Sequence, residues 1–178
     1  MTAARGWRRL AVLLALGFAS AAIAADGERC RLPELPDLPV LEGCRQTAPG
    51  KLELSAATLA RLPFIADGLG VVLAAGQFYY VRRDGHYLPV IAFDNGADYF
   101  VEGRVRAVID GKLGYYDTTL QPAFAARFDW GWPFEDGSAR VCDGCRRGEP
   151  DSNDHVPMVG GRFFRIDRQG TPLPDSTP

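Results

Sequence analysis

The feature that most constrains the fold of this chain is a pair of glycines that returns at a fixed spacing. Gly76 lies eight residues after Gly68, and Gly111 lies eight residues after Gly103. An acidic residue precedes the first glycine of each pair, and an aromatic residue lies two or three positions before the acidic one. The pattern begins a third time at Phe134, so a unit of about 35 residues is present two and a half times.

Each unit has the pattern of a β-hairpin. Short runs of β-branched and aromatic residues suit a half-buried pleated surface. The sequences Asp110-Gly111 and Gly160-Gly161 indicate two-residue turns, which need a positive φ that glycine adopts without steric cost. The strand candidates are 69–73, 76–81, 104–109, 111–116, 138–141 and 161–166. Since one hairpin cannot bury its apolar face alone, we predict an all-β fold of consecutive antiparallel β-hairpin repeats of about 35 residues.

This unit resembles the WG repeat found in many bacterial proteins, whose signature runs from an aromatic and an acidic-Gly pair to Gly-Lys-Trp-Gly-Tyr. Residues 134–141 match its first half, residues 111–117 match its second half, and residues 161–167 are a weaker copy. The Trp position holds Phe78, Leu113 and Phe163 instead, and the one Trp-Gly pair, Trp130-Gly131, falls elsewhere in the unit. The resemblance implies a degenerate member of a family of β-hairpin repeats whose function is mostly unknown or scaffold-like, with no catalytic residues to transfer.

The N-terminus, residues 1–24, has the pattern of a secretory signal peptide. Arg5, Arg8 and Arg9 precede an apolar run at 10–18, and Ala22-Ile23-Ala24 fits a small-x-small cleavage site. The alternative is an uncleaved membrane anchor, for which the run is short and rich in alanine. We therefore predict a periplasmic or secreted protein with no stable membrane span once the signal is removed.

Residues 25–63 are predicted to form a Pro-rich strap with a short helix. Leu-Pro pairs recur every three residues at 32–39, which is the period of a polyproline II helix. Ser55 can cap a helix over 56–62 that Pro63 ends. The repeat domain then covers 64–170, and the polar, Pro-rich tail at 171–178 is predicted to be flexible.

All four cysteines follow the predicted signal peptide, and an even number of cysteines in an oxidising compartment indicates disulfides. Four cysteines allow three pairings. Proximity in the sequence favours Cys30 with Cys44 and Cys142 with Cys145.

The third unit carries an insertion at about 142–157, and insertions between strands become surface loops that often hold function. The first hypothesis for its cysteines is a structural disulfide within Cys142-x-x-Cys145. The second is a redox-active pair, although Gly148 and Pro150 oppose the helix that such pairs usually begin. The third is a zinc site in which Cys142, Cys145 and His155 are ligands.

The second candidate feature is the aromatic group around Trp130 and Trp132. With Asp129 beside them, these tryptophans could stack on sugar rings or hold a peptide. The alternative is a core role, because Phe128, Trp130, Trp132 and Phe134 share one face at strand spacing.

The predicted function is that of an exported, non-enzymatic β-repeat protein that binds or scaffolds in the bacterial cell envelope. A formal net charge of -2 disfavours nucleic acid as a partner. The sequence shows no catalytic triad, phosphate loop or zinc-protease motif, and we predict no cofactor. The partner is expected to be an envelope protein or a cell-wall component. The alternative function is thiol–disulfide exchange or redox sensing by Cys142 and Cys145.

Overall fold

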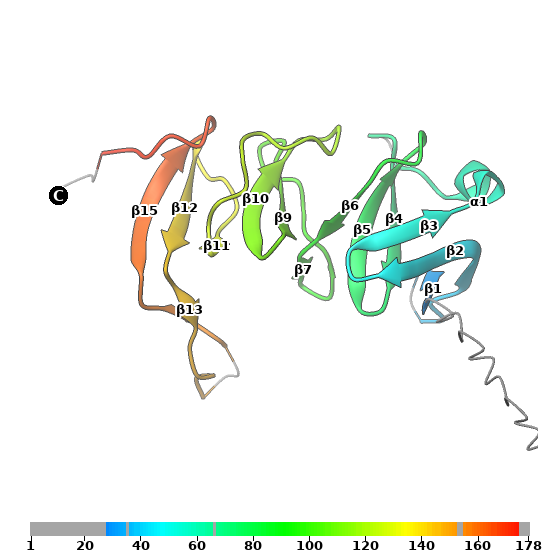
Figure 1. Ribbon diagram of the computed structural model, residues 1–178, viewed down its shortest axis with the longest axis horizontal. Coiled ribbons are helices and arrows are strands. Elements are labelled where there is room, and N and C mark those ends of the chain that lie inside the picture. Colours follow the sequence, from blue (N-terminus) through cyan, green and yellow to red (C-terminus); the bar gives the residue numbers. More distant parts are fainter. Residues whose placement is uncertain (1–27, 35, 66, 153–154, 175–178) are drawn as a thin grey trace, which may run out of the picture.

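The computed structural model describes residues 28–34, 36–65, 67–152 and 155–174. The predicted signal peptide and residues 175–178 of the predicted tail lie outside this part. Within it, the chain forms an elongated row of antiparallel sheets with one short helix at the N-terminal end (Figure 1). The predicted all-β class is therefore confirmed. No helix among the described residues is long and apolar enough to cross a membrane.

Six strands form the first sheet, in the order β3-β2-β1-β4-β5-β6. Their bounds are β1 Glu28–Arg31, β2 Val40–Ala48, β3 Lys51–Leu54, β4 Leu69–Ala74, β5 Gln77–Arg82 and β6 Tyr87–Val90. The segment expected to be a polyproline strap thus supplies three strands, and its Leu-Pro pairs lie only in the link between β1 and β2. The difference arises because Arg31 pairs with Leu73 of β4, which brings this N-terminal segment into the sheet.

Helix α1 (Ala56–Arg61) closes the N-terminal end of this sheet. The Ser55 side chain accepts a hydrogen bond from the Thr58 N–H at 3.1 Å, which satisfies one of the free donors of the first turn. Leu62 follows the helix and packs on Gly70, where a Cβ would lie 2.5 Å from the Leu62 Cδ2 atom. Gly70 therefore permits the close approach of helix and sheet.

Two tight hairpins follow one another along the row. The β4–β5 hairpin turns at Ala75 and Gly76, with φ of 49° and 73°. The hairpin of β9 (Val105–Ile109) and β10 (Lys112–Tyr116) turns at Asp110 and Gly111, with φ of 51° and 76°. The positive φ at both positions is the geometry of the two-residue turn predicted at Asp110-Gly111. The short pair β7 (Ala92–Phe93) and β8 (Gly96–Ala97) lies between these hairpins.

The third sheet has the order β11-β12-β15, with bounds Trp130–Gly131, Ser138–Asp143 and Arg162–Asp167. The insertion extends away from this sheet and forms a two-stranded sheet of its own, in which β13 (Arg146–Arg147) pairs with β14 (Met158–Val159). The prediction of a hairpin turn at Gly160-Gly161 is wrong, because β15 pairs with β12 across the whole insertion. Both glycines have positive φ, 70° and 68°, but they join β14 to β15.

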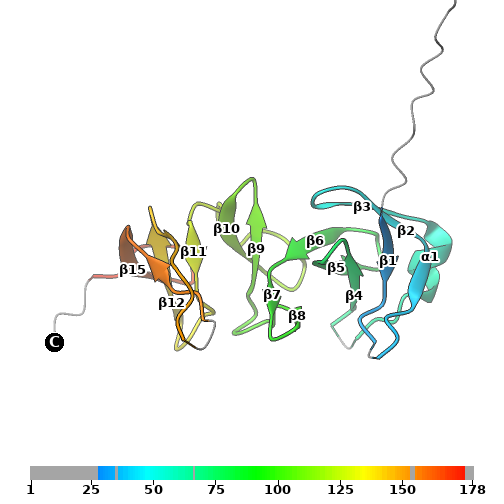
Figure 2. The same ribbon diagram turned by 90° about the horizontal axis from the view of Figure 1, so that it is seen from below.

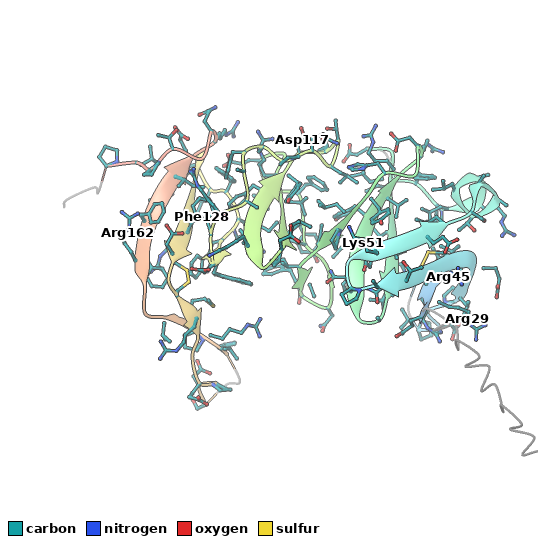
Figure 3. All side chains as sticks on the ribbon, in the orientation of Figure 1. Arg29, Arg45, Lys51, Asp117, Phe128 and Arg162 are labelled. Atoms are coloured by element: carbon teal, nitrogen blue, oxygen red, sulfur yellow. A yellow bond between two sulfur atoms is a disulfide. The ribbon has the colours of Figure 1, made fainter. Side chains whose placement is uncertain are left out.

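Figure 2 shows the sheets following one another in a row. Buried side chains between neighbouring sheets hold this row together. One cluster fills the space between the first sheet and the β9–β10 hairpin, and a second joins that hairpin to the third sheet. The second cluster consists of Leu113, Tyr115, Phe128, Phe134, Ala139, Val141 and Ile166. Figure 3 places Phe128 between the second and third sheets and Arg162 on the outermost strand. A further cluster lies on the other face of the first sheet, beneath α1.

Candidate binding face

We call the packed contact between two successive sheets of the row a joint. The same kind of hydrogen bond occurs at both joints. The Tyr80 hydroxyl of β5 donates to the Asp98 carbonyl at 2.9 Å, and the Tyr115 hydroxyl of β10 donates to the Trp132 carbonyl at 2.6 Å. Burial raises the pKa of both phenols above the ordinary value, so both remain protonated donors near neutral pH. Each joint therefore binds an extended piece of backbone against the face of the preceding hairpin.

A buried ion pair accompanies the second joint, which we call the inner joint. The Arg106 guanidinium contacts the Asp98 carboxylate through two nitrogens, at 3.0 Å and 2.5 Å. A third nitrogen donates to the Gly131 carbonyl at 3.1 Å, which links β9 to β11. The side chains of Arg106 and Asp98 are only 4% and 3% exposed. The charge of Arg106 is thus neutralised within the joint, and all three guanidinium nitrogens donate hydrogen bonds.

The third sheet presents one face to the inner joint and the opposite face, which we call the outer face, to solvent. Val141 and Ile166 point into the cluster shared with β10. Alternation along the strands then puts Arg140 and Arg165 on the outer face, where both are exposed. These two arginines are register partners, and Arg140 hydrogen-bonds through its carbonyl to Trp132, on the side away from β15. They therefore form a non-hydrogen-bonded pair, the kind whose side chains lie closest.

Aromatic rings flank one member of this pair, Arg140. The Arg140 guanidinium carbon lies 5.0 Å from the ring centre of Trp132 and 4.7 Å from that of Phe163. The two rings are half-buried and 6.1 Å apart. Arg165 donates two hydrogen bonds to the Ser138 hydroxyl. Among the described residues, no carboxylate lies within 4.0 Å of either guanidinium.

Asp129, predicted as part of a ligand site, is engaged by the protein itself. Its carboxylate binds the Lys112 ammonium at 2.5 Å and accepts a hydrogen bond from the Gly144 N–H at 2.5 Å. The Lys112 hydrogen bond, with that of Gly144, lowers the pKa of Asp129 below the ordinary range. Asp129 therefore anchors the start of the insertion to β10.

The four aromatic residues predicted to share one face are divided between two environments. Phe128 and Phe134 are buried in the inner joint. Trp130 is half-buried against that cluster, whereas Trp132 lies on the outer face with Arg140. They separate because Gly131 packs beneath Tyr115, where a Cβ would lie 3.2 Å from the Tyr115 Cζ atom. The close packing holds the backbone of the segment against β10.

Three outer-face residues were not predicted from the sequence, namely Arg140, Phe163 and Arg165. A signal for two of them was present in the turn spacing. Phe163 lies two residues after Gly161, as Leu113 lies two residues after Gly111. Arg165 holds the place corresponding to Tyr115 on the same count. The residues of β10 that form the inner joint therefore indicate the corresponding two positions in β15.

Both predicted disulfides are present. The Cα atoms of Cys30 and Cys44 are 5.3 Å apart, and those of Cys142 and Cys145 are 6.0 Å apart. Cys142 is fully buried and Cys145 is 8% exposed, which restricts the approach of another thiol. His155, the third proposed zinc ligand, has its ring 3.6 Å from the Asp151 carboxylate. Within the described residues, no group of three metal-ligating side chains is close enough to hold a metal ion.

A groove of about 560 Å³ lies between the first sheet and the β9–β10 hairpin. It is open and lined mainly by apolar and aromatic side chains, and His86 is one of the lining residues. The His86 ring approaches the Leu120 carbonyl at 3.3 Å and the Gln121 amide at 3.4 Å. These contacts tie the histidine to the loop after β10, and its backbone N–H donates to the Asp84 carboxylate at 2.9 Å.

No protein-family model, no curated protein and no solved structure matches the chain. A function is therefore supported only by the geometry of the joints and of the outer face.

Proposed function

We propose that the protein is an exported, non-enzymatic binding or scaffold module of the bacterial cell envelope, built from hairpin units of a degenerate WG-like repeat. In this proposal it binds a partner with the outer face of its third sheet. Successive hairpins are copies of one unit, and each uses one face to hold the next. The partner is an envelope protein or a cell-wall component.

One observation carries this proposal: the outer face corresponds to a joint face that has no following unit among the described residues. Arg140 corresponds to Arg106, because they lie three residues after Gly137 and Gly103. Trp132 corresponds to Asp98, because they lie five residues before the same glycines. In the second unit these positions are buried in the joint, whereas Arg140 is exposed. A partner that docks here would cover the half-buried rings and the uncompensated charges, as the next unit does at the inner joint.

Export is supported by the sequence of residues 1–24 and by two disulfides, which persist in oxidising compartments. N-terminal sequencing of the protein isolated from the periplasm or medium should find Ala25 as the first residue. Mature protein that begins at Met1 would contradict the signal peptide.

The binding role can be tested in living cells by site-specific photocrosslinking. A benzophenone side chain at position 140 should give a discrete adduct with an envelope component. The same group at position 45 is the matched control, because Arg45 is an exposed strand arginine at the far end of the row. Trp132→Ala should reduce the adduct at position 140. No adduct from positions 140, 163 and 165, or equal adducts from position 45, would refute the proposed face.

A further inference from the structure

We infer that the outer face takes an acidic, extended segment of a partner polypeptide, which adds as a strand beside β15. This inference rests on the proposed function and names the class of partner. Three features of the described part of the third sheet support it: an open strand edge, a pair of uncompensated arginines, and two rings that flank one of these arginines, Arg140.

Among the described residues, β15 has an open edge at Phe163. In β15 the Arg165 carbonyl accepts from the Leu173 N–H at 2.8 Å, and the Asp167 N–H donates to the Thr171 carbonyl at 2.9 Å. Both groups point away from β12, so by alternation the N–H and C=O of Phe163 point the same way. No described residue hydrogen-bonds to them there. Phe163 thus offers one donor and one acceptor to an added strand.

The inner joint shows what such an edge binds in this protein. Leu113, which corresponds to Phe163, donates to the Phe128 carbonyl at 2.8 Å and accepts from the Phe128 N–H at 3.3 Å. The segment that makes this exchange continues to Trp132, whose carbonyl receives the Tyr115 hydroxyl. An extended polypeptide is therefore the natural occupant of the corresponding edge on β15.

The charge of that segment follows from Arg140 and Arg165. Like charges directly opposite on a sheet repel each other, and no carboxylate within salt-bridge distance relieves them in the described part of the chain. At the inner joint, the corresponding Arg106 binds a carboxylate with two nitrogens. A carboxylate that bridges Arg140 and Arg165 would satisfy both.

Neighbouring groups strengthen this preference. Arg146 and Arg147 of β13 are exposed and also lack a carboxylate partner among the described residues. Asp167 shares the outer face, but its carboxylate accepts hydrogen bonds from the Gln169 and Thr171 N–H groups. The Trp132 and Phe163 rings provide apolar contact for the side chains beside the acidic ones.

The direct test is a titration of the full protein with a blocked peptide of about six alternating valine and aspartate residues, the length of a typical strand. Trp130 and Trp132 are the only tryptophans outside the predicted signal peptide, so intrinsic fluorescence reports on this part of the molecule. We expect a saturable shift. The same peptide with asparagine for aspartate should bind about tenfold more weakly, because charged hydrogen bonds are lost.

Variants of the protein test the two arginines. Arg140→Gln and Arg165→Gln should each weaken binding of the acidic peptide about tenfold, whereas the matched Arg45→Gln should leave it unchanged. Backbone N-methylation of the peptide at alternate residues removes the donors that a strand ladder needs. It should abolish binding on one methylation register and preserve it on the other.

The possible results separate the inference from the proposed function. Equal binding of both N-methylated peptides would overturn strand addition in favour of a general anion site. Displacement of the acidic peptide by a sulfated polysaccharide as effectively as by unlabelled peptide would do the same. If the acidic peptide does not bind while position 140 still crosslinks in cells, the inference fails and the proposed function stands. If neither occurs, both fail. Concentration-dependent self-association lost in Arg140→Gln would assign the face to a second copy of the chain.

Discussion

Arg106 lies three residues after Gly103 and Arg140 lies three residues after Gly137, yet the two arginines occupy opposite environments. The Arg106 side chain is 4% exposed and is held by Asp98, whereas Arg140 lies in solvent between two rings. The difference follows from what covers each face. The segment at 128–134 covers β9–β10, and no described segment covers the corresponding part of β12–β15. The same position therefore serves cohesion in one sheet, and in our proposal it serves recognition in another.

The largest effect expected from breaking the inner joint comes from Asp98→Ala. It leaves the Arg106 guanidinium buried without its carboxylate, so the free energy of unfolding should fall by about 3–5 kcal/mol. Denaturant unfolding measures the loss. The double variant Arg140→Gln/Arg165→Gln should change the same quantity by less than about 0.5 kcal/mol, since those groups are exposed.

A second variant separates loss of the ion pair from loss of packing. Asp98→Leu combined with Arg106→Met removes both charges and should recover much of the stability lost in Asp98→Ala. If Asp98→Ala were as mild as the outer-face variant, the inner joint would not depend on its ion pair.

An intermediate effect is expected from the two disulfides, which lie at opposite ends of the row. Replacing Cys142 and Cys145 by alanine should cost about 2 kcal/mol, and replacing Cys30 and Cys44 should cost about 3 kcal/mol, because the second pair closes a longer loop. Thermal unfolding of each variant checks the order. Reduction of Cys142–Cys145 by mild reductant without any change in stability would instead favour the redox alternative.

The smallest effect is the pH dependence of the contact between Asp129, Lys112 and Gly144. The lowered pKa of Asp129 means that its contribution to stability is complete above the unfolded value of about 3.9 and is lost as pH falls through the lower folded value. Both side chains of the ion pair are partly exposed, so the effect should be below about 1 kcal/mol.

The measurement is unfolding free energy against pH for the native protein and for Asp129→Asn. The difference between the two proteins should shrink as the solution is acidified below about pH 4. A difference that stays constant over that range would show that the carboxylate charge does not hold the insertion in place.

Local features of this chain could be predicted from its sequence. The turn at Asp110-Gly111 and the strands beside it depend on residues a few positions apart, and both disulfides join cysteines close in sequence. Features that need a register between distant residues could not be predicted. The opposition of Arg140 and Arg165 is set across the insertion, and the pairing of Arg31 with Leu73 spans the helix.

The candidate site shows the same division. Trp132 was identified because aromatic residues gather around it, but its separation from Phe128 depends on the close packing of Gly131 against Tyr115. Asp129 stands beside the tryptophans in sequence, while its carboxylate is taken by Lys112 from the neighbouring hairpin. Adjacency along the chain indicated the region, and tertiary contacts decided which side chains are available.

The insertion within the third sheet also sets an order of assembly. In β4–β5 and β9–β10 the strands meet across two-residue turns, so little chain entropy is lost before the first pairs form. In the third sheet, Asp143 must find Arg162 across the loop that holds β13 and β14. Closing that loop is slower, and the Cys142–Cys145 bond shortens the free chain only slightly. The end of the molecule that we propose for recognition is thus expected to be the last to fold.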